Sequence, residues 1–259
     1  MIRLIATDMD GTLLNSKNEI DKSFYEVLPK LREKDIKFTI ASGRQYDTLL
    51  QIFQDISDNL IFIAENGTYV KYKDEEIMVN PLDKPLVHKL IQRAREVEDG
   101  YIVLCGKNAS YVENTNPKFI KEVEKYFKHY EIVDNVEEVD DLILKVTVCD
   151  FKGAETNSSH LFEEYKTCAQ VTVSGFLWLD VVAQGVNKGM ALEGIQKVFN
   201  ITPAETMVFG DYLNDLEMMK VAEHSYAMAN AHEDLKKAAR YIAKSNDENG
   251  VVEELKKLI

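Results

Sequence analysis

The chain has 259 residues, of which 45% are hydrophobic and 29% charged, a composition typical of a folded globular protein. This length allows one large α/β domain or two smaller domains, each with its own core. The formal net charge of −13 argues against nucleic acid or an acidic membrane as a partner, because neither would meet a basic surface. Any anionic substrate must therefore be held by a few local cations.

The cysteines and the first residues of the chain indicate the cellular compartment of the protein. The three cysteines, Cys105, Cys149 and Cys168, show no close pairing, which is typical of free thiols in a reducing environment. Asp8 interrupts the apolar start after seven residues, so we expect neither a signal peptide nor a membrane span. The five histidines form no pair at metal-ligand spacing. These features predict a cytoplasmic protein.

The chain opens with a short apolar run that ends in two carboxylates, Asp8 and Asp10, followed by Gly11. Such a run predicts a strand buried on both faces, and side chains two residues apart in a strand point the same way. The two carboxylates should therefore converge, and their repulsion favours a bound cation or a chemical role. An ordinary turn is the alternative. An EF-hand fits poorly, because Gly11 stands fourth in the loop and not sixth.

A helix is expected next, with Asp21 as its N-cap and apolar residues at helical spacing. Pro29 lies inside this pattern and should bend or shorten the helix.

A second strand, over residues 36–41, ends in Ser42, Gly43 and Arg44. A glycine at a strand-to-helix turn lets backbone N–H groups approach an oxyanion, and the helix N-terminus adds a favourable dipole. A plain turn is about as common for such a tripeptide. A third strand over 60–64 and a hairpin through 69–79, with Asn-Gly as turn residues, complete a βαβαβ pattern that predicts a doubly wound, Rossmann-like α/β core.

The pattern changes over residues 83–185. We expect helices near 84–98, 117–129 and 154–166, and strands near 101–105, 110–112, 142–148, 170–174 and 177–182. They predict an antiparallel α+β unit inserted into a core formed by residues 1–82 and 186–259. The insertion has no cluster of acids, no histidine pair and no glycine loop, so we expect no catalytic centre of its own.

Polar residues gather again after the insertion. Lys188 precedes a helix over 190–199, a position where a lysine is usually solvated. A buried strand over 206–209 then ends in a segment that carries Asp211, Asn214 and Asp215, more polar side chains than a turn needs. Residues 225–228 and 241–243 are expected to form edge strands.

Taken in order, these segments resemble the four motifs of the haloacid dehalogenase superfamily: Asp8 and Asp10, then Ser42, then Lys188, then Asp211 with Asn214 and Asp215. The resemblance covers essentially the whole chain. An insertion between the second and third motifs is similar to the Cof-type branch with a large α/β cap. Residues 64–67, 105–106, 110–112 and 172–176 resemble bacterial sugar phosphatases, some of which carry Asn in place of Arg44.

The resemblance implies a role for each of these residues. Asp8 would be the nucleophile, Asp10 the general acid and base, and Asp215 an orienter of Lys188 or of the metal. Mg²⁺ would bind the carboxylates of Asp8 and Asp211 and the main-chain carbonyl of Asp10. The phosphate would be held by Ser42, Gly43, Arg44, Lys188 and Asn214. The expected activity is hydrolysis of a phosphomonoester, a sugar phosphate in the first place, through an aspartyl-phosphate intermediate.

Other functions remain open at this point. The substrate could be another small phosphorylated metabolite, such as a cofactor or nucleotide phosphate, or the chain could be a non-catalytic sugar-phosphate sensor on the same fold. A dehalogenase normally lacks the second aspartate, and a phosphomutase usually carries its cap between the first two motifs. The sequence specifies neither the substrate nor the oligomeric state.

Overall fold

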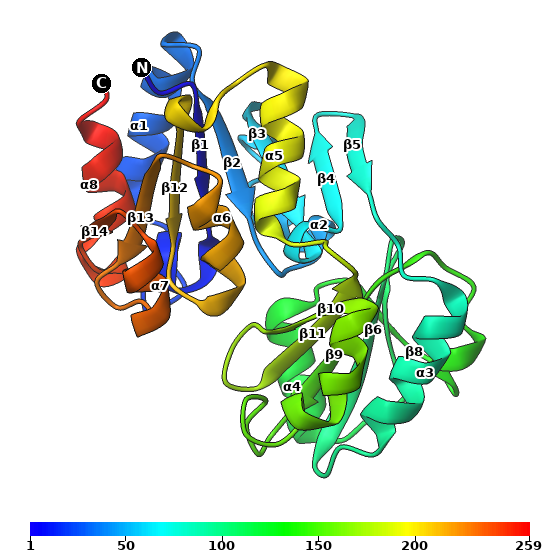
Figure 1. Cartoon of the computed structure of the whole chain (residues 1–259). Coiled ribbons are helices and arrows are strands. Elements are labelled where there is room, and N and C mark those ends of the chain that lie inside the picture. Colours follow the sequence, from blue (N-terminus) through cyan, green and yellow to red (C-terminus); the bar gives the residue numbers. More distant parts are fainter.

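Two β-sheets organise the chain in the computed structural model, which describes residues 1–259 (Figure 1). We call the first sheet with its helices the core unit, and the second sheet with its helices the inserted unit. The chain passes from the first sheet to the second between β5 and α3, and it returns between β11 and α5. This is the predicted fold class: a doubly wound α/β core with an inserted α+β unit. No helix is both long and apolar enough to span a bilayer.

The first sheet has eight strands in the order β14-β13-β12-β1-β2-β3-β4-β5. Its parallel strands are β1 (Leu4–Thr7), β2 (Lys37–Ala41), β3 (Leu60–Ala64), β12 (Thr206–Gly210), β13 (His224–Met228) and β14 (Tyr241–Ala243). The hairpin of β4 (Tyr69–Tyr72) and β5 (Glu75–Val79) adds two antiparallel strands. Of the two expected edge strands, only β14 lies at an edge, because β13 pairs on both sides.

Helices cover both faces of this sheet (Figure 1). Helices α5 (Lys188–Phe199) and α6 (Leu216–Lys220) pack together on one face, and α1 (Lys22–Glu33) packs with α8 (Gly250–Lys256) on the other. The short helices α2 (Tyr46–Ile52) and α7 (Glu233–Ala238) complete the unit. A continuous cluster of 43 buried apolar residues, all but Leu144 from this unit, forms its core.

Helix α1 tests two local predictions. The carboxylate of Asp21 accepts a hydrogen bond from the backbone N–H of Ser23 at 2.8 Å, as expected of an N-cap. Pro29 does not end the helix, which continues to Glu33. Pro29 has no backbone N–H to donate to the carbonyl of Tyr25, four residues earlier. Tyr25 lies on the exposed side of the helix, where water can take the place of the missing donor.

The second sheet has six strands in the order β10-β11-β9-β6-β7-β8. The strands are β6 (Gly100–Gly106), β7 (Ser110–Val112), β8 (Tyr130–Ile132), β9 (Ile143–Asp150), β10 (Ala169–Val173) and β11 (Trp178–Ala183). All neighbours are antiparallel except β7 and β8. The helices α3 (Lys84–Arg95) and α4 (Pro117–Tyr126) pack against this sheet.

Two details of the inserted unit differ from the expectation. Strand β8 was not predicted, because its short, partly exposed Tyr-Glu-Ile sequence has no apolar periodicity. The helix expected over 154–166 is wrong: the chain makes turns and then a 3₁₀ segment, Ser159–Thr167. The Asp150 carboxylate accepts hydrogen bonds from the backbone N–H groups of Lys152 and Ser158, and Gly153 has φ +104°. These contacts satisfy local donors without an α-helix.

The two faces of the second sheet have different characters. Along β9, Val146 and Val148 belong to the larger apolar cluster of the inserted unit, whereas the alternate residues Lys145 and Thr147 are buried polar residues. Asp180 of β11 pairs in register with Thr147 and so lies on the same face. This polar face borders the cavity described below.

Candidate active site

The site lies where the direction of strand winding reverses. Strands β1 and β12 are parallel neighbours, with Thr7 opposite Phe209, and β2 pairs on the other side of β1. Ligands in open α/β sheets bind at the carboxyl ends of the strands at such a switch point. Asp8, Asp211 and Ser42 each directly follow one of these three strands, so all three reach the same edge of the sheet.

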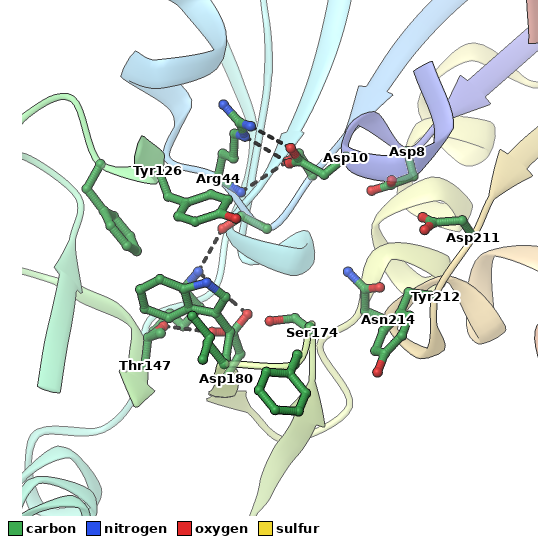
Figure 2. A pocket seen from close by; sticks show the side chains of 18 residues that line it. Asp8, Asp10, Arg44, Tyr126, Thr147, Ser174, Asp180, Asp211, Tyr212 and Asn214 are labelled. Atoms are coloured by element: carbon green, nitrogen blue, oxygen red, sulfur yellow. Dashed lines mark hydrogen bonds and ion pairs between the residues drawn. The ribbon is translucent and has the colours of Figure 1, made fainter. Parts of the chain in front are cut away.

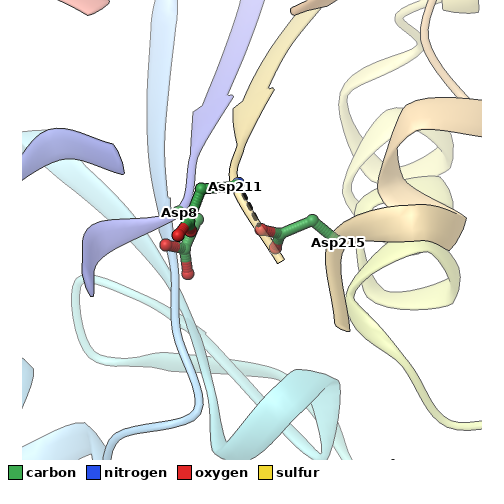
Figure 3. A group of neighbouring side chains, drawn as sticks. All are labelled: Asp8, Asp211 and Asp215. Atoms are coloured by element: carbon green, nitrogen blue, oxygen red, sulfur yellow. Dashed lines mark hydrogen bonds between the residues drawn. The ribbon is translucent and has the colours of Figure 1, made fainter. Parts of the chain in front are cut away.

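Three carboxylates cluster at this edge (Figure 3). Each of Asp8, Asp211 and Asp215 offers an oxygen, and these atoms all lie within 4.8 Å of one another. Burial, with the charges of Asp215 and Asp10 added, raises the pKa of Asp8 to about 7 although Lys188 opposes the shift. Burial, together with the charges of Asp8 and Asp215, raises the pKa of Asp211 to about 9. The cluster therefore holds more negative charge than the protein alone compensates.

Lys188 supplies the buried cation of this cluster. It is the first residue of α5, its side chain has 0% exposure, and its Nζ donates to Asp8 Oδ1 at 2.6 Å and to Asp215 Oδ1 at 2.8 Å. Burial opposes the charged form, but the two carboxylates hold the pKa of Lys188 above its ordinary value. Lys188 is thus not the solvated residue that its position at a helix start would by itself suggest.

Both carboxylate oxygens of Asp215 accept hydrogen bonds from other groups of the protein. Its Oδ1 accepts from Lys188, and its Oδ2 accepts from the backbone N–H groups of Asp211 at 3.0 Å and Tyr212 at 3.3 Å. In contrast, Asp8 uses one oxygen on Lys188, and Asp211 uses one oxygen to accept from the Thr12 hydroxyl at 3.1 Å. The other oxygens of Asp8 and Asp211 are the ones available to a metal ion.

Gly11 lets the first loop pass close to this cluster. Its φ is +81°, and a Cβ at this position would lie 2.3 Å from Asp211 Oδ2. A side chain here would strain the backbone and displace the carboxylate.

Asp10 faces away from the carboxylate cluster (Figure 2). The expected convergence of the Asp8 and Asp10 carboxylates is wrong, because strand β1 ends at Thr7 and Asp10 lies in the irregular turn that follows, where strand alternation does not apply. Its carboxylate accepts two hydrogen bonds from Arg44, from Nε at 2.8 Å and from Nη2 at 2.5 Å. Arg44 is positioned in turn by its backbone N–H, which donates to Ser42 Oγ at 3.1 Å.

The turn after β3 contributes Asn66, for which we expected only a role in the turn. Glu65 and Asn66 both have positive φ, +50° and +56°, so this segment is a tight turn as expected. The side chain of Asn66 also accepts from Asn214 Nδ2 at 3.1 Å and donates to Asp180 Oδ2 at 2.5 Å. It thereby connects a core-unit motif to the inserted unit.

A cavity of about 500 Å³ opens between the two units (Figure 2). Seven of the nine predicted site residues line it: Asp8, Asp10, Ser42, Gly43, Arg44, Asp211 and Asn214. Lys188 and Asp215 do not line it but lie buried, with Lys188 in contact with both Asp8 and Asp215. The structure therefore brings together all nine residues.

The inserted unit supplies lining residues that the sequence analysis did not identify: Tyr126, Phe127, Lys145, Thr147, Trp178 and Asp180. A signal was present for some of them. Lys145 and Asp180 each interrupt an otherwise apolar strand, at a position where a charged side chain must find a buried partner. The aromatic residues gave no comparable signal, because an aromatic side chain in such a unit is usually core.

Comparison with known proteins identifies the family. Residues 5–255 match the haloacid dehalogenase-like hydrolase family. The 5-amino-6-(5-phospho-D-ribitylamino)uracil phosphatase YbjI of Escherichia coli is 30% identical, over 100% of this chain and 96% of that protein. The HMP-PP phosphatase of Citrobacter koseri is 28% identical, over 89% of this chain and 85% of that protein. The crystal structure of SMU.1108c from Streptococcus mutans superimposes with a TM-score of 0.93 at 33% identity, over 100% and 99% of the two chains. The chain therefore belongs to the haloacid dehalogenase-like hydrolase family and is an enzyme of its phosphatase type.

Proposed function

We propose that this protein is a Mg²⁺-dependent hydrolase of small phosphomonoesters that acts through an aspartyl phosphate on Asp8. The observation that carries the proposal is the position of Asp8. This carboxylate borders the cavity, is held on one oxygen by the buried Lys188, and lies beside a second carboxylate, Asp211, that has a free oxygen. A nucleophile fixed in this way is oriented but not blocked.

The residues fit a hard divalent cation. Asp8 and Asp211 would hold it with their free carboxylate oxygens, and the Asp10 main-chain carbonyl is the third expected ligand. Burial first, and the neighbouring carboxylates second, raise the pKa values of the two aspartates, so ionising both without a cation is unfavourable. A phosphate adds repulsion of about 4 kcal/mol per charge pair at 4 Å and an effective dielectric of about 20. A bound Mg²⁺ would offset this repulsion and polarise the phosphoryl group.

The proposed reaction has two steps. In the first, an Asp8 oxygen bonds to phosphorus, the ester P–O bond breaks, and Asp10 donates a proton to the leaving alkoxide. In the second, water attacks the phosphorus of the aspartyl phosphate, Asp10 takes its proton, and the Asp8 carboxylate and inorganic phosphate are released. The Arg44 hydrogen bonds keep the Asp10 carboxyl group in one orientation through both steps.

The remaining phosphate oxygens need donors that are already in place. Lys188, the Ser42 hydroxyl, the Gly43 backbone N–H and the Asn214 amide are the proposed donors. Arg44 uses Nε and Nη2 on Asp10, so its Nη1 is the group that we assign to the phosphate. Asp215 positions Lys188.

The substrate class has two candidates. A sugar phosphate is the first, because Asp180, Thr147 and Ser174 offer polar contacts at the cavity wall. A phosphorylated compound with a planar ring is the second. It is favoured by the aromatic side chains of Tyr126, Phe127 and Trp178 in the same wall, and the name of the E. coli relative contains both a phosphoribityl group and a uracil.

The test is phosphate release from a panel of sugar phosphates and phosphorylated ring compounds, with Mg²⁺ and with chelator, compared by kcat/KM. We expect Mg²⁺-dependent turnover that the Asp8→Asn variant lacks. Binding of sugar phosphates without turnover of any ester would instead support a non-catalytic sensor.

A further inference from the structure

The end of the cavity away from Asp8 is lined by the polar face of the inserted sheet, and its one cation is already engaged. Lys145, 2% exposed, lies with its Nζ 2.6 Å from Glu65 Oε2 and 3.7 Å from Asp180 Oδ2, and it donates to the Gly43 carbonyl at 2.7 Å. Two of these three oxygens lie within hydrogen-bond distance, and the two carboxylates together outweigh the single positive charge of Lys145. Lys145 therefore links the two units, and its positive charge is already paired with two carboxylates.

The carboxylates around Lys145 outnumber it. Glu65 and Asp180 carry two formal negative charges against one positive charge, and both side chains are nearly fully buried. Asp180 also borders the cavity, where its two oxygens accept from Thr147 Oγ1 at 2.7 Å and from Asn66 Nδ2. A carboxylate oxygen has a second lone pair, so Asp180 can still accept a hydrogen bond from a ligand.

The other two cations near the cavity also have carboxylate partners, and both are assigned above to the phosphate and not to the leaving group. Lys188 is shared by Asp8 and Asp215, and Arg44 makes its two-pronged contact with Asp10. The remaining wall at this end is aromatic, with Tyr126 and Trp178 in edge-to-face contact at a centroid distance of 5.4 Å. Aromatic faces attract C–H groups and cations and repel anions.

We propose that the leaving-group end of this cavity accepts phosphomonoesters whose leaving group is neutral or cationic and rejects those that carry a second anionic group. The inference rests on the proposed hydrolysis of phosphomonoesters at Asp8. A second carboxylate or phosphate at this end would lose its water, find no unpaired cation and lie beside Asp180. A hydroxyl or ammonium group could instead donate to Asp180.

The test uses three esters whose one para substituent is anionic, neutral or cationic: para-carboxyphenyl, para-(hydroxymethyl)phenyl and para-(aminomethyl)phenyl phosphate. Their phenols are of similar acidity, so differences in kcat/KM report on recognition and not on leaving-group chemistry. We expect the carboxylate ester to be worse than the hydroxymethyl ester by about tenfold or more, and the aminomethyl ester to be at least as good as the hydroxymethyl ester.

Two variants test whether Asp180 causes the discrimination against the carboxylate ester. Asp180→Asn removes one charge from the cavity wall and should reduce the discrimination against the carboxylate ester several-fold. Glu193→Gln removes one charge from the exposed side of α5 and should leave it unchanged. Equal kcat/KM values for the carboxylate and hydroxymethyl esters in the wild-type protein would overturn the proposal, and so would undiminished discrimination in a folded Asp180→Asn protein. The ratio of kcat/KM for the carboxylate and hydroxymethyl esters in the wild-type protein tests the proposal even if Asp180→Asn fails to fold.

Binding of the same three esters to the Asp8→Asn protein, measured by calorimetry with Mg²⁺ present, separates this proposal from the proposed function. If the wild-type protein hydrolyses none of the esters, the hydrolase proposal fails, while the order of the three affinities still supports or contradicts the charge selectivity.

Discussion

Asn66 of the core unit donates a hydrogen bond to Asp180 of the inserted unit, with 2.5 Å between Nδ2 and Oδ2. The same side chain accepts from Asn214, a proposed phosphate donor. One buried amide thus connects the residue that would hold the phosphate to the wall that would contact the leaving group. Asn66 has a left-handed backbone conformation, which strains the chain locally at this position.

Replacing Asn66 by glycine should remove its side-chain hydrogen bonds without adding backbone strain. Asn66→Gly keeps access to positive φ, so we expect it to lower kcat/KM about tenfold with a small loss of stability. Asn66→Ala should lose the same activity and a further 1–2 kcal/mol or so of unfolding free energy, the cost of a left-handed alanine. Asn200→Gly, at an exposed residue with φ +51°, is the control. Wild-type kinetics in Asn66→Gly would show that the turn alone matters.

Lys188→Met tests the buried cation. Asp8 and Asp215 would lose their shared partner, which we expect to lower the free energy of unfolding by about 3–5 kcal/mol at neutral pH and kcat/KM by orders of magnitude. The loss of stability should shrink at lower pH, where the buried Asp8 carboxyl group, whose pKa is raised to about 7, takes a proton. Urea unfolding at two pH values measures this, with Lys197→Met on the exposed end of the same helix as control. Unchanged kinetics and stability would mean that Lys188 has neither role.

Asp10→Asn tests the general acid. A sugar alkoxide needs a proton as the P–O bond breaks, whereas nitrophenolate leaves readily without one. The variant keeps the main-chain carbonyl and an oxygen for Arg44, but it lacks the proton. We therefore expect phosphoenzyme formation, followed by rapid quench, to slow much more with a sugar phosphate than with para-nitrophenyl phosphate. An equal loss with both esters would make Asp10 a purely structural residue.

The sequence predicts the parts of the site that follow a buried strand. Apolar runs that end abruptly in polar residues located Asp8, Ser42 and Asp211, because parallel strands in a doubly wound sheet end at one edge. The sequence could not predict contacts that depend on how the two units pack against each other. Asn66 and Asp180 are far apart in the chain, and no periodicity links them. The direction of Asp10 toward Arg44 was also not predictable, since it depends on an irregular turn.

Mg²⁺ should stabilise the protein more as the pH rises. In the metal-free protein the pKa values of Asp8 and Asp211 are raised to about 7 and about 9, so the folded state keeps protons that the unfolded chain has lost. The stability from these protonated groups disappears as the pH rises through the two values. The metal needs both carboxylates ionised, so its apparent affinity must increase over the same range.

The measurement is the Mg²⁺-induced rise in Tm at about pH 6 and about pH 8.5. We expect the larger rise at the higher pH, and Asp211→Asn should remove most of it. A rise in Tm that does not depend on pH, or that survives in Asp211→Asn, would place the metal elsewhere.

In the proposed mechanism, Asp8 becomes phosphorylated during turnover. The most direct measurement is rapid acid quench of a single turnover with a radiolabelled phosphomonoester, followed by peptide mapping of the protein. We predict that label appears on the peptide containing Asp8, rises and decays at rates compatible with kcat, and is absent in Asp8→Asn. Release of labelled phosphate with no protein-bound label at any time, or label on a different residue, would contradict the mechanism.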